Sequence, residues 1–417
     1  LSIANAGVAG TVVENFGVGS SVSISENRIT INPTADINAT QIYHISYPSG
    51  AFTNNEGTDY VGTGYTFEGR AYNYEVWQWG GQNGRGHFGF NTNISYSSPV
   101  QLPGTDWVQA YNGKYNNYWL KNNNTLWGAG RNSFGQLGQN SIASPANHGL
   151  SSPVQIPGTT WAIEDRKFSS SSYATTHAIK TDGTLWGWAS GNQGQGGWLD
   201  ILSRSSPTQI PGTTWSKVSG NSAATMAIKT DGTLWGWGYN LQGNIGMHSP
   251  VAQSAKVSSP VQVGSDTTWS DVNLTGYYGA TGLKTDGTLW SWGFNNQGQL
   301  GLSDAAARSS PTQIPGTTWS KIGTNGGQYS GIVQGAIKTD GTLWVWGYNE
   351  YGGLGLSNTI EYSSPVQIPG TTWNEIGTTG YNDFMVTKTD GTLWSWGLNE
   401  AGQLGHNQNG PSGMKSS

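Results

Sequence analysis

Side chains capable of acid–base, metal or nucleophilic chemistry are scattered along this chain. Cysteine is absent from the 417 residues, which excludes a thiolate metal site, a thiol nucleophile and a disulfide framework. The six histidines stand at unrelated positions, and no two have the spacing of paired metal ligands. They are His44, His87, His148, His177, His248 and His406. These patterns predict no catalytic, cofactor-binding or metal-binding site.

Carboxylates offer two further possibilities. A glycosidase needs two carboxyl groups that face each other across a cleft. The acidic residues are too dispersed to nominate such a pair, as Asp200, Glu350, Glu361 and Asp383 illustrate. Residues 54–59 gather several oxygen ligands suited to calcium, but they lack the alternating spacing of a dedicated calcium loop. We therefore expect a protein without catalytic activity.

Composition narrows the range of partners. Only 10% of the residues are charged, the net charge is −5, and the basic residues do not cluster. This disfavours nucleic acid and anionic membranes as partners. No segment approaches the roughly 18 to 20 apolar residues needed to cross a bilayer. The first residues lack a signal-peptide pattern, so we expect a mature or clipped product.

The elements that would position a site come from a repeat. The segment Lys-Thr-Asp-Gly-Thr-Leu-Trp recurs with spacings of 49 to 59 residues, which suits a four-stranded antiparallel sheet. Five copies and two degenerate copies end at Trp186, Trp235, Trp290, Trp344, Trp394, Trp127 and Trp77. Asp-Gly predicts a two-residue type I′ hairpin turn, which Asn123-Asn124 provides in one degenerate copy.

Tryptophan is placed by the same repeat. All but Trp119 and Trp198 of the 21 tryptophans occupy one of three repeat positions. One such position opens the first strand of each unit, as at Trp215 or Trp319, and two lie in the strand after the hairpin. A residue that returns in every unit is best explained by packing between sheets. We predict that these tryptophans form the core.

The sequence Leu-Trp-Ser-Trp-Gly-x-Asn-x-x-Gly-Gln-Leu-Gly, at residues 289–301 and 393–405, resembles the repeat of the regulator-of-chromosome-condensation propeller family. The resemblance covers residues 71–405 and implies a seven-bladed β-propeller. Ala129 replaces the second tryptophan in one copy and Ala189 replaces a glycine in the next, which predicts local distortion. Eukaryotic members exchange nucleotide on a small nuclear GTPase and touch chromatin, but the loops responsible do not map onto this sequence.

Residues 1–69 do not share the repeat. Residues 29–33 and 41–47 alternate apolar and polar side chains as half-buried strands do. Residues 43–67 resemble the C-terminal half of bacterial immunoglobulin-like domains. We therefore predict an all-β chain with a partial immunoglobulin-like β-sandwich at 1–69 and a seven-bladed propeller at 70–417. The first blade lacks inner strands, which we expect from residues 60–75, residues 406–417 or another polypeptide.

Recognition is expected on the face that carries the loops between the first and second strands of each unit, because the repeats stop resembling one another there. These loops combine tyrosine with Gly, Ser and Asn, a mixture that suits protein or sugar binding. The candidate residues are Tyr111, Tyr115, Tyr118, Trp119, Tyr173, Tyr277, Tyr278, Tyr329, Tyr381, Asn382 and Asp383.

These observations predict a non-enzymatic recognition or adhesion module that is extracellular, on a cell or virion surface, and binds a cell-surface glycan or protein receptor. The N-terminal module would attach it to other copies or to a particle scaffold. No nucleic-acid partner and no membrane insertion are expected. Two alternatives remain: a structural component of a filament or virion coat, and a secreted enzyme inhibitor, since a bacterial β-lactamase inhibitor resembles this propeller.

Overall fold

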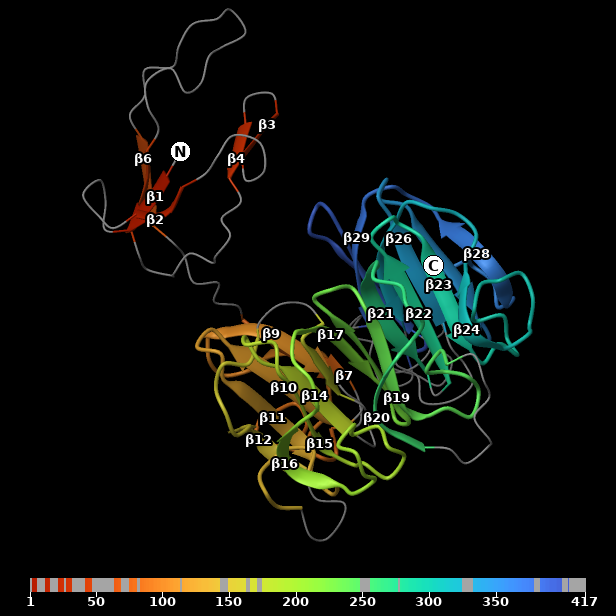
Figure 1. The fold of residues 1–417 in the computed structure, drawn as a ribbon, viewed down its shortest axis with the longest axis horizontal. Helices are drawn as coiled ribbons and strands as arrows, with labels where there is room; N and C mark the ends of the chain where they lie inside the picture. The colour runs from red at the N-terminus through yellow and green to blue at the C-terminus, as the bar shows by residue number, and fades with distance from the viewer. Residues whose placement is uncertain are drawn as a thin grey trace, which may run out of the picture. The chain divides into compact units, whose positions relative to one another are not determined.

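The computed structural model describes two compact units, residues 1–73 and residues 74–417. The described residues are 2–5, 12–15, 22–25, 28–31, 42–46, 64–68, 75–80, 83–112, 115–142, 149–162, 166–170, 175–247, 256–276, 278–324, 333–378, 383–399 and 404. Every element among them is a β-strand, which confirms the all-β prediction (Figure 1).

The first unit contains one four-stranded antiparallel sheet in the order β2-β1-β5-β6 and a separate β3-β4 pair. These strands are β1 (Ser2–Asn5), β2 (Val12–Asn15), β3 (Val22–Ser25), β4 (Arg28–Ile31), β5 (Ile42–Ser46) and β6 (Gly64–Glu68). The immunoglobulin-like identity of this unit stays a prediction. The proposed calcium loop at residues 54–59 lies outside the described residues.

The second unit is a propeller of antiparallel sheets, each built from consecutive strands. The first strands are β9 (Trp107–Asn112), β13 (Phe168–Ser170), β17 (Trp215–Gly220), β21 (Trp269–Thr275), β25 (Trp319–Thr324) and β29 (Trp373–Thr378). The second strands are β10 (Asn116–Lys121), β14 (Thr175–Ile179), β18 (Ala224–Lys229), β22 (Gly279–Lys284), β26 (Val333–Lys338) and β30 (Asp383–Lys388).

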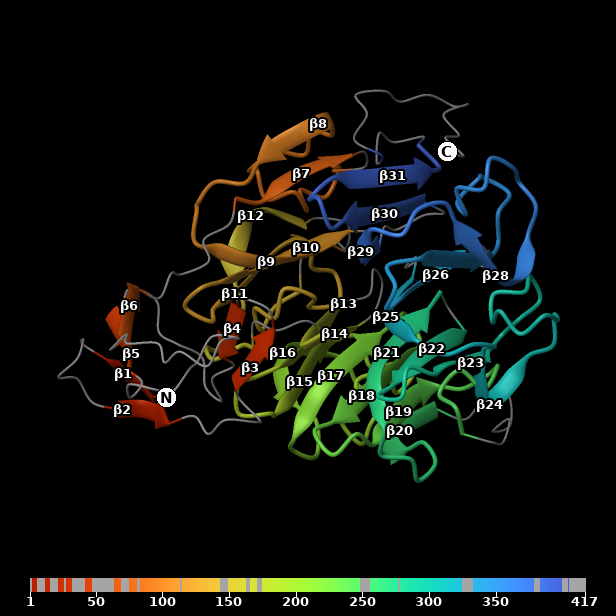
Figure 2. The same ribbon diagram turned by 90° about the horizontal axis from the view of Figure 1, so that it is seen from above.

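The outer strands complete these sheets. The third strands are β11 (Leu126–Arg131), β15 (Leu185–Ala189), β19 (Leu234–Tyr239), β23 (Leu289–Gly293), β27 (Leu343–Gly347) and β31 (Leu393–Gly397). The fourth strands are β12 (Gly149–Gln155), β16 (Arg204–Gln209), β20 (Lys256–Gln262), β24 (Arg308–Gln313) and β28 (Tyr362–Ile368). First strands of successive sheets contact one another from β9 to β29, and Figure 2 shows the sheets following one another around a ring.

The prediction of seven blades is wrong, because the described residues form six blades of three or four strands. The seventh repeat copy contributes only a two-stranded sheet of β7 (Trp77–Gly80) and β8 (Tyr96–Gln101). The prediction counted the Leu-Trp strand of each repeat. A blade also needs the two strands that precede the Leu-Trp strand. Trp77 and Trp394 lie in the incomplete sheets, and they are 48% and 47% exposed.

Tryptophan packing is confirmed as the basis of the core. The six tryptophans that open or precede a first strand are between 1% and 5% exposed, and Trp188, Trp237, Trp292 and Trp346 are at most 1% exposed. The indole Nε1 of Trp346 donates to the Gln299 carbonyl of the previous blade at 3.1 Å. The corresponding tryptophans of four other blades make the same type of bond, so this position joins each sheet to the preceding one.

Both tryptophans outside the repeat positions replace a missing core residue. The ring centroid of Trp119 lies 6.1 Å from that of Trp107. In other blades the second tryptophan of the third strand packs in this way, but in this blade that position is Ala129. Trp198 contacts Gly196, which stands where other copies carry Leu or Ile, and it is 7% exposed. The departures from the repeat therefore preserve the packing by exchanging one residue for another.

One side chain crosses the centre of the ring. The Arg166 Nη2 donates to the Ile322 carbonyl at 2.7 Å, although these residues belong to sheets separated by two others. Arg166 Nε lies 3.5 Å from the Asp271 carboxylate, and Lys217 Nζ lies 3.6 Å from the same carboxylate. Arg166, just before β13, is thus linked to β21 and β25, and Lys217 of β17 shares the same carboxylate.

Candidate functional site

The antiparallel order of each sheet divides its connections between two faces. One face carries the turns between second and third strands, such as residues 230–233, and the connections from one sheet to the next. We call it the hairpin face. The loop face carries the connections between first and second strands and the longer ones between third and fourth strands, such as residues 294–307. The predicted recognition loops belong to the loop face.

Turns on the hairpin face are built from side chains that bond to one another. In one turn the Thr184 hydroxyl donates to Asp182 Oδ1 at 2.6 Å, and Trp186 Nε1 donates to the Thr184 hydroxyl at 2.9 Å. The same chain recurs from Asp231, Asp286, Asp340 and Asp390. Hydrogen bonding from the Thr184 side chain lowers the pKa of Asp182. These aspartates therefore serve the turns.

The turn type differs from the prediction. Gly183 has a φ of 77°, but Asp182 does not have positive φ, as a type I′ turn would require at both positions. The Gly183 amide donates to the Lys180 carbonyl and the Lys180 amide donates to the Thr184 carbonyl, both at 2.9 Å. This is a three-residue hairpin loop in which the aspartate side chain bonds to the following threonine.

The lysine of each turn is held between two tryptophans. Lys284 Nζ lies 4.8 Å from the Trp269 ring centroid and 4.0 Å from the Trp290 ring centroid. The same arrangement recurs at Lys121, Lys180, Lys229, Lys338 and Lys388. Such cation–π contacts are worth about 0.5 to 2 kcal/mol each. The polar chemistry of the hairpin face is therefore used for folding.

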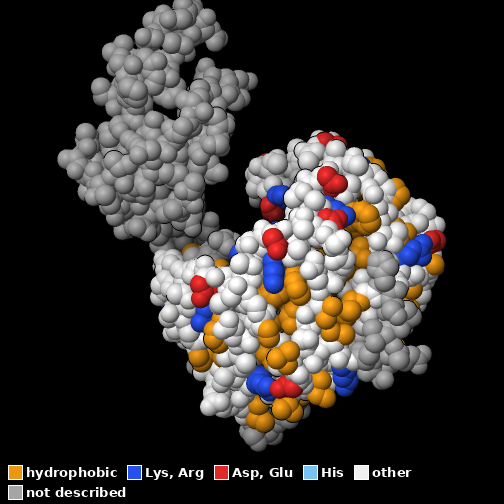
Figure 3. Space-filling view, viewed as in Figure 1, with side chains coloured by type: hydrophobic (Ala, Val, Ile, Leu, Met, Phe, Trp, Pro, Cys, Tyr) orange, Lys and Arg blue, Asp and Glu red, His pale blue; other side chains and the backbone are white. Residues whose placement is uncertain are grey.

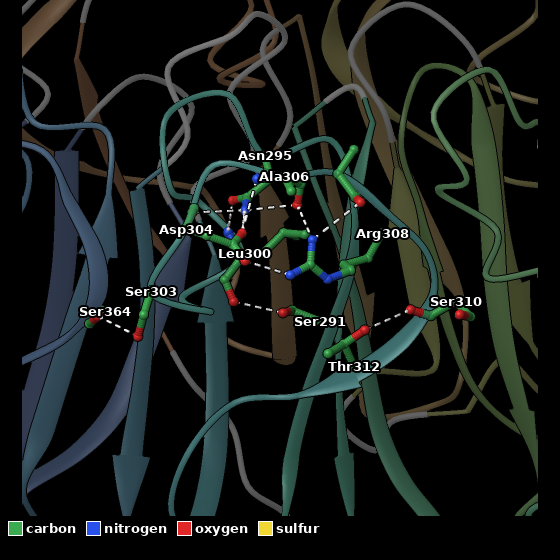
Figure 4. Close-up of polar contacts among 11 residues, drawn as sticks. Ser291, Asn295, Leu300, Ser303, Asp304, Ala306, Arg308, Ser310, Thr312 and Ser364 are labelled. Carbon is green, nitrogen blue, oxygen red and sulfur yellow. Dashed lines mark hydrogen bonds and ion pairs between the residues drawn. The ribbon is translucent and has the colours of Figure 1, made fainter.

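Six long loops of the loop face are each organised by one buried asparagine, whereas the loop at residues 190–203 has Gly191 at that position. The Leu300 amide donates to Asn295 Oδ1 at 2.9 Å, and Asn295 Nδ2 donates to the Asp304 and Ala306 carbonyls at 3.0 Å (Figure 4). Arg308 Nη2 closes the same loop with a 2.6 Å ion pair to Asp304. The same hydrogen bond, from a backbone amide five residues later to an asparagine Oδ1, recurs at Asn83, Asn132, Asn240, Asn349 and Asn399.

Three predicted binding residues lie on the loop face with part of their surface exposed. Tyr111 is half-buried, and its ring centroid lies 4.4 Å from that of Phe168 in the next blade. Tyr278 is half-buried, 6.3 Å from Phe294. Tyr115 is half-buried beneath the Arg85 guanidinium. Their placement allows contact with a partner, and their role in binding stays a prediction.

Three other predicted binding residues are buried and belong to the core. Tyr118 and Trp119 are 0% exposed, and Asp383 is 2% exposed. Tyr118 and Trp119 lie in β10, which is covered by neighbouring sheets on both faces, so alternation along the strand does not expose either one. The Tyr118 hydroxyl donates to the Gln136 carbonyl, and burial raises the pKa of Tyr118 to about 12. These residues cannot contact a partner.

The remaining predicted residues lie outside the described part of the chain. They are Tyr173, Tyr277, Tyr329, Tyr381 and Asn382. The structure instead adds two arginines that the sequence pattern did not single out. Arg85 and Arg131 stand at unrelated repeat positions, yet both lie over the Tyr115 ring. Only the fold reveals that their separate segments meet.

Charged side chains elsewhere are sparse, and several form ion pairs, as Arg204 does with Asp200. Figure 3 shows blue and red side chains of one face in small groups, separated by white and orange areas. Within the described residues, no three His, Asp or Glu side chains gather as metal ligands would. No helix in the described part of the chain is long and apolar enough to span a membrane.

Comparison with known proteins adds family information. Residues 75–415 match the RCC1-like domain model. Ultraviolet-B receptor UVR8 of Arabidopsis thaliana is 30% identical over 21% of this chain and 19% of that protein. The Regulator of chromosome condensation of Xenopus laevis is 33% identical over 22% of each chain. The alignments thus span about a fifth of these relatives.

A solved structure gives the same fold. Prp20p from Saccharomyces cerevisiae, described with its binding properties to Gsp1p and histones, has a TM-score of 0.67 and 17% identity. The alignment covers 80% of this chain and 83% of that one. At this identity, the match shows the propeller fold.

These findings correct the predicted cellular location and support the prediction of a non-catalytic protein. An extracellular, cell-surface or virion-surface location is wrong, because relatives named for chromosome condensation and histone binding point away from it. The sparse charge and abundant Ser, Thr and Asn arise from the repeat itself, where Thr184 and Asn295 build turns and loops. Relatives named as a receptor and a regulator favour a non-catalytic protein. With its propeller sheets and a family match over residues 75–415, the chain belongs to the RCC1-like domain family.

Proposed function

We propose that this chain is a non-enzymatic recognition protein that binds another protein through its loop face. The observation that carries the proposal is the contrast between the faces. On the hairpin face, the same lysine, aspartate, threonine and tryptophan recur and bond to one another. The segments between first and second strands differ in length from sheet to sheet: three residues, 221–223, separate β17 from β18, whereas eight residues, 325–332, separate β25 from β26. Variation on a rigid frame is where recognition usually lies.

A protein is the favoured class of partner. Prp20p is described with binding to Gsp1p and histones, both of which are proteins. Half-buried Tyr111, Tyr115 and Tyr278 supply the aromatic contact area that is common in protein interfaces. A glycan, which the sequence also allowed, is the competing ligand class.

Site-specific photo-cross-linking in an extract of the source cells tests this proposal. A photoreactive amino acid would replace Phe134, which is 40% exposed, or Asn192, which is also exposed, on the loop face. Thr181 and Thr285, exposed on the hairpin face, are the matched control positions. We expect discrete protein adducts from the loop-face positions only.

Other patterns of adducts would contradict the proposal. Equal adducts from both faces, or adducts from the hairpin face alone, would move recognition away from the loop face. Adducts that disappear after treatment with glycosidases would assign the ligand to a glycan.

A further inference from the structure

The loop face carries one group of cationic side chains built around a single tyrosine. The Arg85 guanidinium carbon lies 4.5 Å from the centroid of the Tyr115 ring, and that of Arg131 lies 5.9 Å from the same centroid. Arg131 also lies 5.0 Å from the Phe134 ring, which is 40% exposed. Two positive charges therefore share one aromatic ring. Arg131 is buried, whereas Arg85 and Tyr115 are half-buried, so a partner can reach the group from the Arg85 side.

Backbone packing holds this group together. The Arg131 amide donates to the Tyr115 carbonyl at 2.9 Å. A Cβ added to Gly130 would lie 2.7 Å from the His87 Cβ, so the loop after β7 packs directly on the end of β11. We call Arg85, His87, Tyr115 and Arg131 the arginine cluster. Its members come from three segments that only the fold brings together.

Polar atoms in the cluster have capacity that the described residues do not use. Arg85 Nη1 and His87 Nδ1 are buried and have no hydrogen-bond partner within the described part of the chain. His87 is 5% exposed. Burial, followed by the charge of Arg85, lowers the pKa of His87 to about 4, so the imidazole is neutral at pH 7. A buried polar atom without a partner costs about 1 to 3 kcal/mol.

Other arginines of the loop face carry their own counter-charge. Arg204 and Arg308 each form a 2.6 Å ion pair with an aspartate four residues earlier. Arg85 forms no such pair with any described carboxylate. Sequence explains the difference, because Asp106 is the only acidic residue between positions 76 and 158. Asp106 lies 3.0 Å from Lys121 on the hairpin face.

We propose that the arginine cluster binds a carboxylate side chain from an acidic segment of the protein partner, an inference that rests on the proposed function of the loop face. The planar guanidinium group matches a carboxylate through two parallel hydrogen bonds. The net charge of −5 on the whole chain opposes dense polyanions such as nucleic acid. A local positive site on an acidic molecule therefore favours isolated carboxylates over dense polyanions.

Calorimetric titration of the full chain with two capped peptides tests this inference. The first peptide, acetyl-Gly-Ser-Glu-Glu-Ser-Gly-amide, presents two carboxylates, and the second replaces both Glu by Gln. We expect the Glu peptide to bind about tenfold more tightly than the Gln peptide, as for one lost charge-assisted contact. Arg85→Gln should remove this preference. Arg85→Lys should weaken it, because lysine keeps the charge and loses the planar fork.

Arg204→Gln is the matched control. Arg204 also lies over an aromatic ring, 5.3 Å from Trp198, but Asp200 already pairs with it. We expect this variant to keep the full preference for the Glu peptide. Equal binding of the two peptides to the parent chain, or an unchanged preference in folded Arg85→Gln, would overturn the inference. Tighter binding of inorganic phosphate or of a single-stranded oligonucleotide at an Arg85-dependent site would also overturn it.

Cross-linking separates this inference from the proposed function. If the loop-face positions capture a protein and Arg85→Gln leaves the yield unchanged, protein recognition stands and the role of the cluster fails. If the Glu peptide binds in an Arg85-dependent manner but no protein is captured, the carboxylate site stands and protein recognition fails.

Discussion

At the scale of single residues, Trp119 and Ala129 show how one core volume is kept when the repeat changes. In β10, Trp119 fills the space that the third strand fills in other blades. A Cβ on Gly89 would lie 2.9 Å from Trp119, as a Cβ on Gly246 would lie 3.2 Å from Trp292. Because the tryptophan has moved from position 129 to position 119, we predict that substitutions at these two positions have strongly non-additive effects on the free energy of unfolding.

A double-mutant cycle in denaturant unfolding measures that coupling. Trp119→Ala should cost about 3 to 5 kcal/mol, because it leaves a cavity beside Trp107. Ala129→Trp alone should cost about 1 to 3 kcal/mol, because Trp119 already occupies the space. Together they should cost at least about 2 kcal/mol less than the sum. Additive losses would show that the two residues do not share one volume.

His177 gives the chain a dependence on pH. It is 0% exposed, and burial lowers its pKa from 6.5 to about 3. A lowered pKa means that the unfolded state binds the proton more tightly. The stability contributed by neutral His177 is therefore complete above pH 6.5 and falls as the pH drops towards about 3.

His177→Met tests this dependence, since Met226 occupies the same position opposite a glycine in β18. Between pH 7 and 4.5, the free energy of unfolding of the parent chain should fall by about 2 to 3 kcal/mol more than that of the variant. Titration of His87 and the carboxylates is common to both proteins. Parallel pH profiles would refute the buried neutral histidine.

At the scale of elements, the last glycine of each long loop is fixed by the next blade. Gly301 has a φ of 68°, and a Cβ there would lie 2.9 Å from Trp346 Nε1. Gly264 has a φ of 66° with no atom within 4 Å of an added Cβ. Gly264→Ala should cost about 1 kcal/mol, from backbone strain alone. Gly301→Ala should cost about 2 kcal/mol more in thermal unfolding, because Trp346 must shift. Similar losses would mean that the tryptophan yields without cost.

How far sequence predicts the elements depends on whether their cause is local. The strands and the positions of the hairpin turns were predictable, because Asp-Gly acts within a few residues, but the type I′ geometry expected at Gly183 was not found. Blade number was not, because a sheet depends on strands paired over distance, and the copy at Trp77 contributes only β7 and β8. Exposure of Tyr118 was misjudged since neighbouring sheets cover both faces of β10. The meeting of Arg85 with Tyr115 leaves no trace in the repeat.

At the scale of the whole molecule, Arg166 links two sheets that are not consecutive, because two other sheets lie between them along the chain. Its side chain is 19% exposed and bonds both the Ile322 carbonyl and Asp271. Arg166→Met should lower the free energy of unfolding by about 2 to 4 kcal/mol, because it leaves Asp271 with one cation fewer. Arg308→Met, which breaks a pair whose side chains are 28% and 42% exposed, should cost under about 1 kcal/mol. Equal losses would show that the cross-ring contact adds nothing to closure.

The most direct test of recognition through the loop face is hydrogen exchange on the chain alone and in complex with the captured partner. A complex formed as proposed should slow exchange at residues 132–142 and 190–203. It should leave residues 181–184 and 230–233, in turns of the hairpin face, unchanged. Protection confined to those turns, or no protection on either face, would contradict the account.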